Sequence, residues 1–141
     1  MRKRVTMHIE NKEQMKAWTL AFLEGLEPGA VVALDGDLGA GKTQMVRWIA
    51  RALGVEGRIT SPTFDLIHAY ETDRGPLYHM DLYRLEEAEE IEDLNYEEAF
   101  YSDHGLAFVE WPDRAGDYLP PHTIWVSITK GEGEEREVDI R

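Results

Sequence analysis

The chain has 141 residues, no cysteine and a formal net charge of −13. Its length suits one compact domain, 1–141, and the lack of cysteine excludes disulfides and thiolate chemistry. A surface this acidic repels nucleic-acid phosphates, so we expect RNA to be reached only through a basic partner. Polar residues soon interrupt the basic start, and no long apolar run follows, so we expect a cytoplasmic protein without a membrane segment.

The first 29 residues predict a strand followed by a helix. The strand is expected over Val5–Ile9, and Asn11 can then cap a helix whose third position, Gln14, completes a capping-box pattern. The packed face of this helix is expected to contain Met15, Trp18, Thr19, Phe22 and Leu26. Glu27-Pro28-Gly29 ends the helix and leads into the next strand.

The next segment contains a complete phosphate-binding loop, between an apolar stretch at 30–34 and a helical pattern at 45–53. Its residues are Gly36, Asp37, Leu38, Gly39, Ala40, Gly41, Lys42 and Thr43. In such loops the glycines let backbone N–H groups surround phosphates, and the helix dipole adds positive charge. The lysine reaches the β- and γ-oxygens, and the threonine hydroxyl ligates Mg²⁺. The pattern therefore predicts a bound nucleoside triphosphate with Mg²⁺.

The residues after this loop favour a binding loop over a glycine-rich turn without a ligand. Apolar residues at positions 45, 48, 49, 52 and 53 follow the spacing of one buried helix face. Gly54 stands where a helix-ending glycine belongs. The loop thus has the strand before it and the helix after it that the motif requires.

The remainder of the chain predicts five strands and one acidic helical region. The strands are expected near 64–70, 77–83, 106–110, 124–129 and 137–140, and the helical region over 86–101. Turn signals at 73–76 and 131–133 join neighbouring strands, so part of the sheet should be antiparallel. We therefore expect an α/β fold of the P-loop NTPase type, with a mixed parallel and antiparallel sheet flanked by helices.

Two carboxylates are candidates for the same site. Glu110 ends an apolar strand, as do the Mg²⁺ ligands of many phosphate-loop enzymes, although it is also compatible with an ordinary strand end. Alternation places Asp81 on one strand face with Leu77 and His79, where it could orient the attacking water or act through the Mg²⁺ shell. The alternative for Asp81 is an ion pair with Arg84 or a cap for a neighbouring turn.

Two further segments have a functional and a structural interpretation. Hydroxyls in Thr60-Ser61-Pro62-Thr63 could respond to the γ-phosphate or to Mg²⁺, or the segment could be an ordinary proline turn. Trp111 could stack beside the nucleotide or simply pack. The acidic runs at 86–93 and 132–137 are either solvated surface or a docking surface for a basic partner.

Four motifs together resemble the TsaE family, also called YjeE, the bacterial ATPase of the tRNA threonylcarbamoyladenosine pathway. They are Gly-Asp-Leu-Gly-Ala-Gly-Lys-Thr at 36–43, Ser-Pro-Thr-Phe at 61–64, His-x-Asp-Leu-Tyr-Arg-Leu at 79–85 and Val-Glu-Trp-Pro at 109–112. Their order and spacing cover nearly the whole chain. The resemblance implies an accessory ATPase that binds ATP and Mg²⁺ and is slow unless docked on TsaB and TsaD. It also implies that TsaD is the transferase and that this protein, when alone, is a monomer or associates weakly.

The resemblance also implies residue roles. Leu38 to Thr43 would wrap the phosphates, Thr43 and Glu110 would hold Mg²⁺, and Asp81 would act near the γ-phosphate. Further roles are implied for Ser61 and Thr63 as a nucleotide-responsive switch, for Trp111 at the nucleotide or a partner, for Asn11 near the base, and for Gly133 through its backbone.

One departure from the family lies in the last hairpin, where members often have Gly-Arg and this chain has Gly133-Glu134. A role for that arginine is expected here only if Arg136 substitutes for it.

Two rival functions share parts of this pattern. A small-molecule kinase would use the same loop but usually adds a basic lid segment, which the sequence does not show. Nucleotide could also serve only as an assembly ligand. A GTPase usually carries an Asn-Lys-x-Asp motif, which is absent, so ATP is preferred.

Overall fold

A seven-stranded mixed sheet organises the residues that the computed structural model describes, 4–37, 39–62 and 65–141. The strand order is β1-β7-β6-β2-β5-β4-β3. The strands are β1 Val5–Ile9, β2 Val31–Gly36, β3 Ile67–Thr72, β4 Gly75–Asp81, β5 Leu106–Glu110, β6 Ile124–Lys130 and β7 Arg136–Ile140. Strands β6, β2, β5 and β4 pair in parallel, and the outer pairs are antiparallel, which confirms the predicted mixed sheet.

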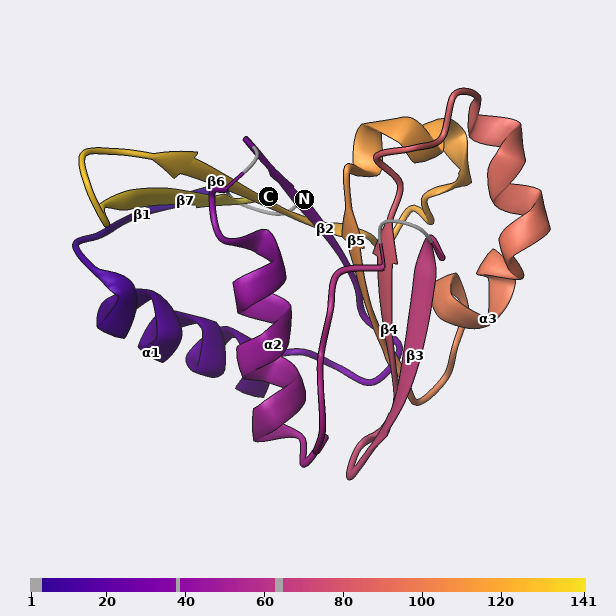
Figure 1. Ribbon diagram of the computed structural model, residues 1–141, viewed down its shortest axis with the longest axis horizontal. Helices are drawn as coiled ribbons and strands as arrows, with labels where there is room; N and C mark the ends of the chain where they lie inside the picture. The colour runs from indigo at the N-terminus through magenta and orange to yellow at the C-terminus, as the bar shows by residue number, and fades with distance from the viewer. Residues whose placement is uncertain (1–3, 38, 63–64) are drawn as a thin grey trace.

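Helical segments cover both faces of this sheet (Figure 1). Helices α1 Lys12–Glu24 and α2 Lys42–Ala52 lie on one face. The other face is covered by the 3-10 helix η1 Ala88–Leu94, the short helix α3 Tyr96–Phe100 and the 3-10 helix η2 Pro112–Tyr118. In the part of the chain that is described, no helix has the length and apolarity to cross a membrane.

The central strands are apolar in nearly every position because both of their faces are buried. In β5, Phe108 packs into the core under α1 and α2, whereas Ala107 and Val109 pack into the core under η1 and α3. In β4, Leu77 belongs to the first core and Met80 to the second. The predicted alternation of β4 is therefore confirmed.

The start of α1 and the end of α2 agree with the sequence prediction, whereas α1 ends at Glu24 with Gly25 as its C-cap, before the expected Glu27-Pro28-Gly29. The Asn11 side chain accepts a hydrogen bond from the Gln14 backbone N–H at 2.9 Å and so caps α1. At the end of α2, Gly54 has a φ of +88°, and the next N–H, of Val55, bonds back to the Ala50 carbonyl at 3.0 Å. This pair of features is a Schellman motif, which depends on a residue that tolerates positive φ.

The acidic segment does not form the single helical region expected over 86–101. It divides at Asn95, which adopts a left-handed conformation with a φ of 55° between η1 and α3. Asparagine tolerates this conformation better than other side chains, so it ends one helix and begins the next. The break lets Ile91 of η1 and Phe100 of α3 both reach the same buried cluster.

The strands β3 and β4 are displaced from the expected 64–70 and 77–83. Leu66 has a φ of 69°, which prevents a regular strand before Ile67, and Phe64 lies outside the described residues. Strand β4 ends at Asp81 because the Asp81 Oδ1 atom accepts a hydrogen bond from the Tyr83 N–H at 3.0 Å and closes a turn. The segment η2 was not predicted at all.

The carboxyl ends of the parallel strands β4, β5 and β2 meet at one edge of the sheet. Asp81 ends β4, Glu110 ends β5 and Gly36 ends β2. Asp81 and Glu110 are in register in neighbouring strands, and Glu110 is in register with Leu34 of β2. The topology therefore brings both candidate carboxylates beside the phosphate-binding loop.

Candidate functional site

The loop between β2 and α2 has the backbone of a phosphate cradle. Gly36 has a φ of +147°, and a Cβ atom there would lie 2.5 Å from the Ile128 carbonyl oxygen of β6, so only glycine fits. Gly41 is the N-cap residue of α2 with a φ of 112°, and as a glycine it has no side chain to cap the helix. The N–H groups of the first turn of α2 therefore face the loop with the positive end of the helix dipole.

Lys42 lies over this cradle rather than pointing into solvent. Its side chain is buried, and its Nζ donates a hydrogen bond to the Gly36 carbonyl at 2.6 Å. The same ammonium group lies 4.2 Å from the centroid of the Trp111 ring, a cation–π contact. The Gly36 carbonyl at the start of the loop and the Trp111 ring after β5 thus hold the lysine at the wall of the pocket.

Thr43 and Glu110 are in direct contact. The Thr43 hydroxyl lies 2.9 and 3.1 Å from the two carboxylate oxygens of Glu110, which is 4% exposed. A hydroxyl and a carboxylate are hard oxygen donors, which Mg²⁺ prefers. Mg²⁺ at nucleotide sites commonly takes only one or two ligands from the protein and the others from phosphates and water. The donor set therefore fits the predicted Mg²⁺.

Asp81 points into the same pocket and also has a structural contact. Its Oδ2 accepts a hydrogen bond from the Ser61 hydroxyl at 3.0 Å, while its Oδ1 closes the turn to Tyr83. The turn cap that the sequence offered as the alternative role is thus present, but it uses only one of the two oxygens. Asp81 is 5% exposed and lines the pocket with Ser61.

These residues line one cavity of about 370 Å³. It is bounded by Gly39, Gly41, Lys42, Thr43, Gln44, Ser61, Asp81, Glu110 and Trp111. The structure therefore brings together candidates from four separate sequence motifs. Leu38 and Thr63 lie outside the described residues, so their predicted roles stay predictions. Asp37 and Ala40 belong to the loop itself and share a backbone hydrogen bond of 3.0 Å.

Trp111 follows Glu110 directly and has a left-handed backbone with a φ of 56°. This turn directs its ring toward Lys42, and the Tyr83 ring lies 5.0 Å away between centroids. A non-glycine residue in this conformation is strained, and such strain is common where a side chain is positioned for function. Trp111 thus packs against Tyr83, which agrees with the interpretation of this residue as a packing residue, and it also lines the phosphate pocket.

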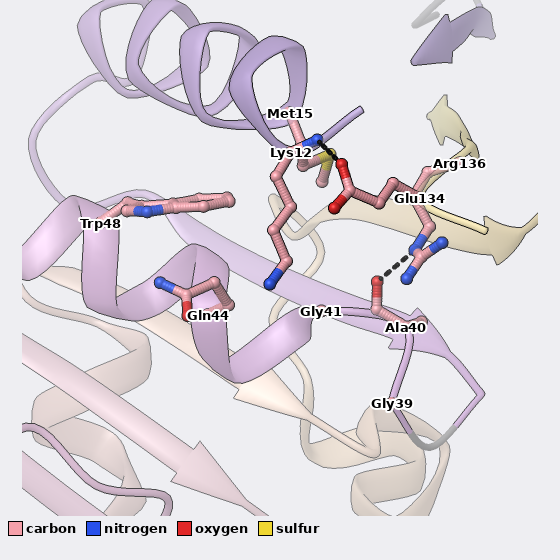
Figure 2. Close-up of a pocket in the computed structure, with 9 residues that line it drawn as sticks. All are labelled: Lys12, Met15, Gly39, Ala40, Gly41, Gln44, Trp48, Glu134 and Arg136. Carbon is pink, nitrogen blue, oxygen red and sulfur yellow. Dashed lines mark hydrogen bonds between the residues drawn. The ribbon is translucent and has the colours of Figure 1, made fainter. Parts of the chain in front are cut away.

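A second cavity of about 220 Å³ lies on the other side of the loop (Figure 2). Figure 2 shows Lys12 extending from the start of α1 between Trp48 and the loop, with Gln44 below it. Across the cavity, Glu134 accepts a hydrogen bond from the Lys12 backbone N–H at 3.2 Å. The two cavities share Gly39, Gly41 and Gln44, so they form adjoining sections of one surface.

Arg136 contacts the phosphate-binding loop. From the sequence, a role for an arginine of the last hairpin was expected only if Arg136 took it over. Its Nε donates to the Ala40 carbonyl at 3.0 Å, and its Nη1 donates to the Gly133 and Glu135 carbonyls. The arginine therefore ties the β6–β7 connection to the phosphate loop. Gly133 has a φ of 57°, and its carbonyl accepts one of these hydrogen bonds from Arg136. Gly133 is not among the described residues that line the second cavity.

Asn11 and Gly133 were predicted near the nucleotide. In the structure each of them directly precedes, along the chain, a residue that lines the second cavity. Of the residues that the structure describes, their neighbours Lys12 and Glu134 line the second cavity, and Asn11 and Gly133 do not. Asn11 uses its side chain to cap α1. Their contacts with a nucleotide therefore stay predictions.

Sequence reasoning predicted the loop residues of the second cavity but missed Lys12 and Trp48 there, and it missed one buried residue of the first site. Lys12 and Trp48 belong to helices whose patterns signal packing, and only the topology brings them to the loop. The missed residue of the first site is His79, which contacts Glu110. The sequence feature that could have identified it is a polar residue on a buried strand, two positions before Asp81.

The fold and the loop together define a protein of the α/β class with the P-loop NTPase fold. Residues 9–138 match the family model described as threonylcarbamoyl adenosine biosynthesis protein TsaE. The chain belongs to the TsaE family.

Individual relatives agree with this assignment. The chain is 39% identical to the tRNA threonylcarbamoyladenosine biosynthesis protein TsaE of Bacillus subtilis, over 91% of this chain and 79% of that protein. It is 42% identical to the protein of the same name from Nostoc sp., over 94% of this chain and 82% of that one. The crystal structure of YdiB from Bacillus subtilis has a TM-score of 0.78 and 32% identity, covering 99% of this chain and 86% of that one.

Proposed function

We propose that this protein binds ATP with Mg²⁺ and hydrolyses it slowly, in support of the formation of threonylcarbamoyladenosine in tRNA. The observation that carries the proposal is the convergence of the loop, the Thr43–Glu110 pair and the Asp81–Ser61 pair on one cavity. The relatives' name places the family in this modification. The proposed place of action is the cytoplasm.

The two adjoining cavities suit the two parts of a nucleotide. The cavity with Lys42, Thr43 and Asp81 has polar and charged side chains in its wall and carries the phosphate-binding backbone, so it suits the triphosphate. The cavity with Met15 and Trp48 offers apolar and aromatic surface, as a nucleoside requires. ATP would therefore lie across the loop, with its base between α1 and α2 and its phosphates toward Glu110.

Catalysis in this proposal comes from positioning and from neutralised charge. The Lys42 ammonium is held at the cavity wall, from where it can donate to phosphate oxygens in place of the Gly36 carbonyl. Thr43 and Glu110 would hold Mg²⁺, which when bound neutralises charge on the β- and γ-phosphates. Asp81 has one oxygen fixed by Tyr83, and its other oxygen, which also accepts from the Ser61 hydroxyl, would accept a proton from the attacking water or orient it.

The phosphate cavity suggests why a partner is needed. Within the described part of the chain, none of the residues that line it is an arginine. Phosphoryl transfer is often accelerated by an arginine supplied from a second protein. We therefore propose that TsaB and TsaD bind next to this cavity and complete it, that TsaD performs the transfer, and that tRNA is contacted only through this complex.

The proposal predicts that Asp81→Asn reduces ATP hydrolysis by about 100-fold or more, because removal of a positioned base costs this much. The amide oxygen still accepts from Tyr83, so binding of ATP should stay within a few-fold of wild type. Phosphate release and equilibrium binding measure the two quantities, and Asp113→Asn, at an exposed aspartate of η2, is the matched control.

Unchanged hydrolysis in Asp81→Asn would contradict the catalytic role of Asp81. A variant that bound ATP and the TsaB–TsaD pair normally, hydrolysed nothing and still supported repeated rounds of tRNA modification would favour nucleotide as an assembly ligand. Transfer of phosphate to a small acceptor instead of water would favour the kinase.

A further inference from the structure

The imidazole of His79 lies beneath the proposed ion site and is completely buried. It is on β4, two residues before Asp81 and in register with Phe108 of β5. Leu77 and Phe108 belong to the apolar core at this level of the sheet. An apolar side chain would suit this environment without the cost of burying a polar ring, so the histidine requires another explanation.

His79 makes one polar contact, and it is with Glu110. Its Nε2 lies 2.5 Å from the Glu110 Oε2 atom. Among the described residues, its Nδ1 is the only buried side-chain nitrogen or oxygen without a hydrogen-bond partner. A proton on Nδ1 would be a buried donor without an acceptor, and it would leave the Nε2 lone pair facing a carboxylate oxygen. The geometry therefore assigns the proton to Nε2, which donates to Glu110.

The contact with His79 fixes the Glu110 carboxylate from the side that faces the protein core. The Thr43 hydroxyl has one proton and lies within reach of both Glu110 oxygens, so it can donate to only one of them at a time. By contrast, the His79 ring is held by the core and donates to Oε2 in a fixed direction. Groups behind a metal ligand that orient it in this way commonly change ion affinity 10- to 100-fold when they are removed.

We infer that His79 is a positioning residue that holds Glu110 in the orientation in which it serves Mg²⁺. The inference rests on the proposed function for the ion itself, but the hydrogen bond and the proton position can be tested on the protein without ligands. His79 acts only through Glu110 and lies below the cavity, because it is not among the residues that line it. It therefore gives the ion site a rigid base rather than an additional ligand.

The test compares His79→Leu, which removes the donor but keeps an apolar volume, with His79→Gln, which keeps an N–H donor. Binding of ADP is measured by calorimetry across a range of Mg²⁺ concentrations and with chelator. In His79→Leu we expect the Mg²⁺ concentration for half-maximal effect to rise about 10- to 100-fold. The affinity for ADP with chelator should stay within about two-fold, and His79→Gln should restore most of the Mg²⁺ response.

One control variant and one NMR measurement distinguish a positioning role of His79 from a general loss of structure. His68→Leu makes the same change at the histidine directly opposite in β3 and should leave the Mg²⁺ response unchanged. In addition, nitrogen NMR of the ligand-free protein should show His79 protonated at Nε2, and Glu110→Gln should shift that resonance.

The outcomes test the role of His79 and the proposed function separately. A wild-type Mg²⁺ response in His79→Leu, or a His79 proton at Nδ1, would overturn this inference alone. Wild-type protein that bound ADP without any response to Mg²⁺ would contradict the proposed function as well.

Discussion

Lys42→Ala is expected to reduce ATP hydrolysis by about 100- to 1,000-fold, the cost of removing one positioned group that stabilises charge in a closed site. In the structure the Lys42 ammonium is held between the Gly36 carbonyl and the Trp111 ring at the wall of the phosphate cavity. Alanine leaves the backbone cradle intact but removes the cation that we propose meets the β- and γ-phosphates. Steady-state phosphate release with Mg²⁺ measures the effect.

The matched control for Lys42→Ala is Lys16→Ala, which removes an exposed lysine of α1. The control should hydrolyse ATP at the wild-type rate and unfold at the same denaturant concentration. Hydrolysis by Lys42→Ala within three-fold of wild type would show that the loop is not the catalytic phosphate site.

The second large effect concerns stability. Phe108→Ala should lower the free energy of unfolding by about 3–5 kcal/mol, because it leaves a cavity in the core. Phe108 is completely buried in β5, in register with Val32 of β2 and His79 of β4. It packs under α2 on the sheet face that also presents Glu110, so the same change should weaken nucleotide binding. Urea unfolding followed by circular dichroism measures the stability.

Tyr101→Ala provides the comparison for Phe108→Ala, because Tyr101 is 56% exposed. Loss of an exposed side chain should change the free energy of unfolding by about 0.5 kcal/mol or less. If Phe108→Ala cost less than about 1 kcal/mol, the packing of the central strands described above would be wrong.

Much of the fold follows from local patterns in the sequence. The bounds of β1 and β5 agree with the predicted strands, and the alternation in β4 assigned its two faces correctly. The mixed sheet was predicted from turn signals and apolar runs, which are local features. Glu110 was found because it ends an apolar strand, and in an α/β sheet the strand ends meet at the ligand, whereas Asp81 was found because alternation places a carboxylate on one face of its strand.

The parts that sequence did not predict depend on single backbone conformations or on distant contacts. Asn95 and Leu66 take positive φ; Asn95 ends η1, and Leu66 delays the start of β3, where propensity alone would continue a regular element. The His79–Glu110 contact joins residues 31 positions apart. No local signal identifies such a partner, because the sheet order decides which strands become neighbours.

The second cavity shows the same limit. Asn11 and Gly133 were predicted at the nucleotide, whereas Lys12 and Glu134 line the cavity. At the first position the reason is the direction of the side chains, because Asn11 uses its side chain to cap α1 and Lys12 extends toward the loop, whereas Gly133 has no side chain that could enter the cavity. A shift of one position along a turn changes which side chain enters a cavity, and sequence patterns do not resolve it.

The measurement that tests the central claim most directly is phosphate release from ATP by the wild-type protein with Mg²⁺, alone and with purified TsaB–TsaD, with Lys42→Ala as the blank. We predict slow hydrolysis by the protein alone and stimulation by the pair that disappears in Lys42→Ala. Rapid hydrolysis that does not depend on the pair, or none under either condition, would contradict the account of an accessory ATPase.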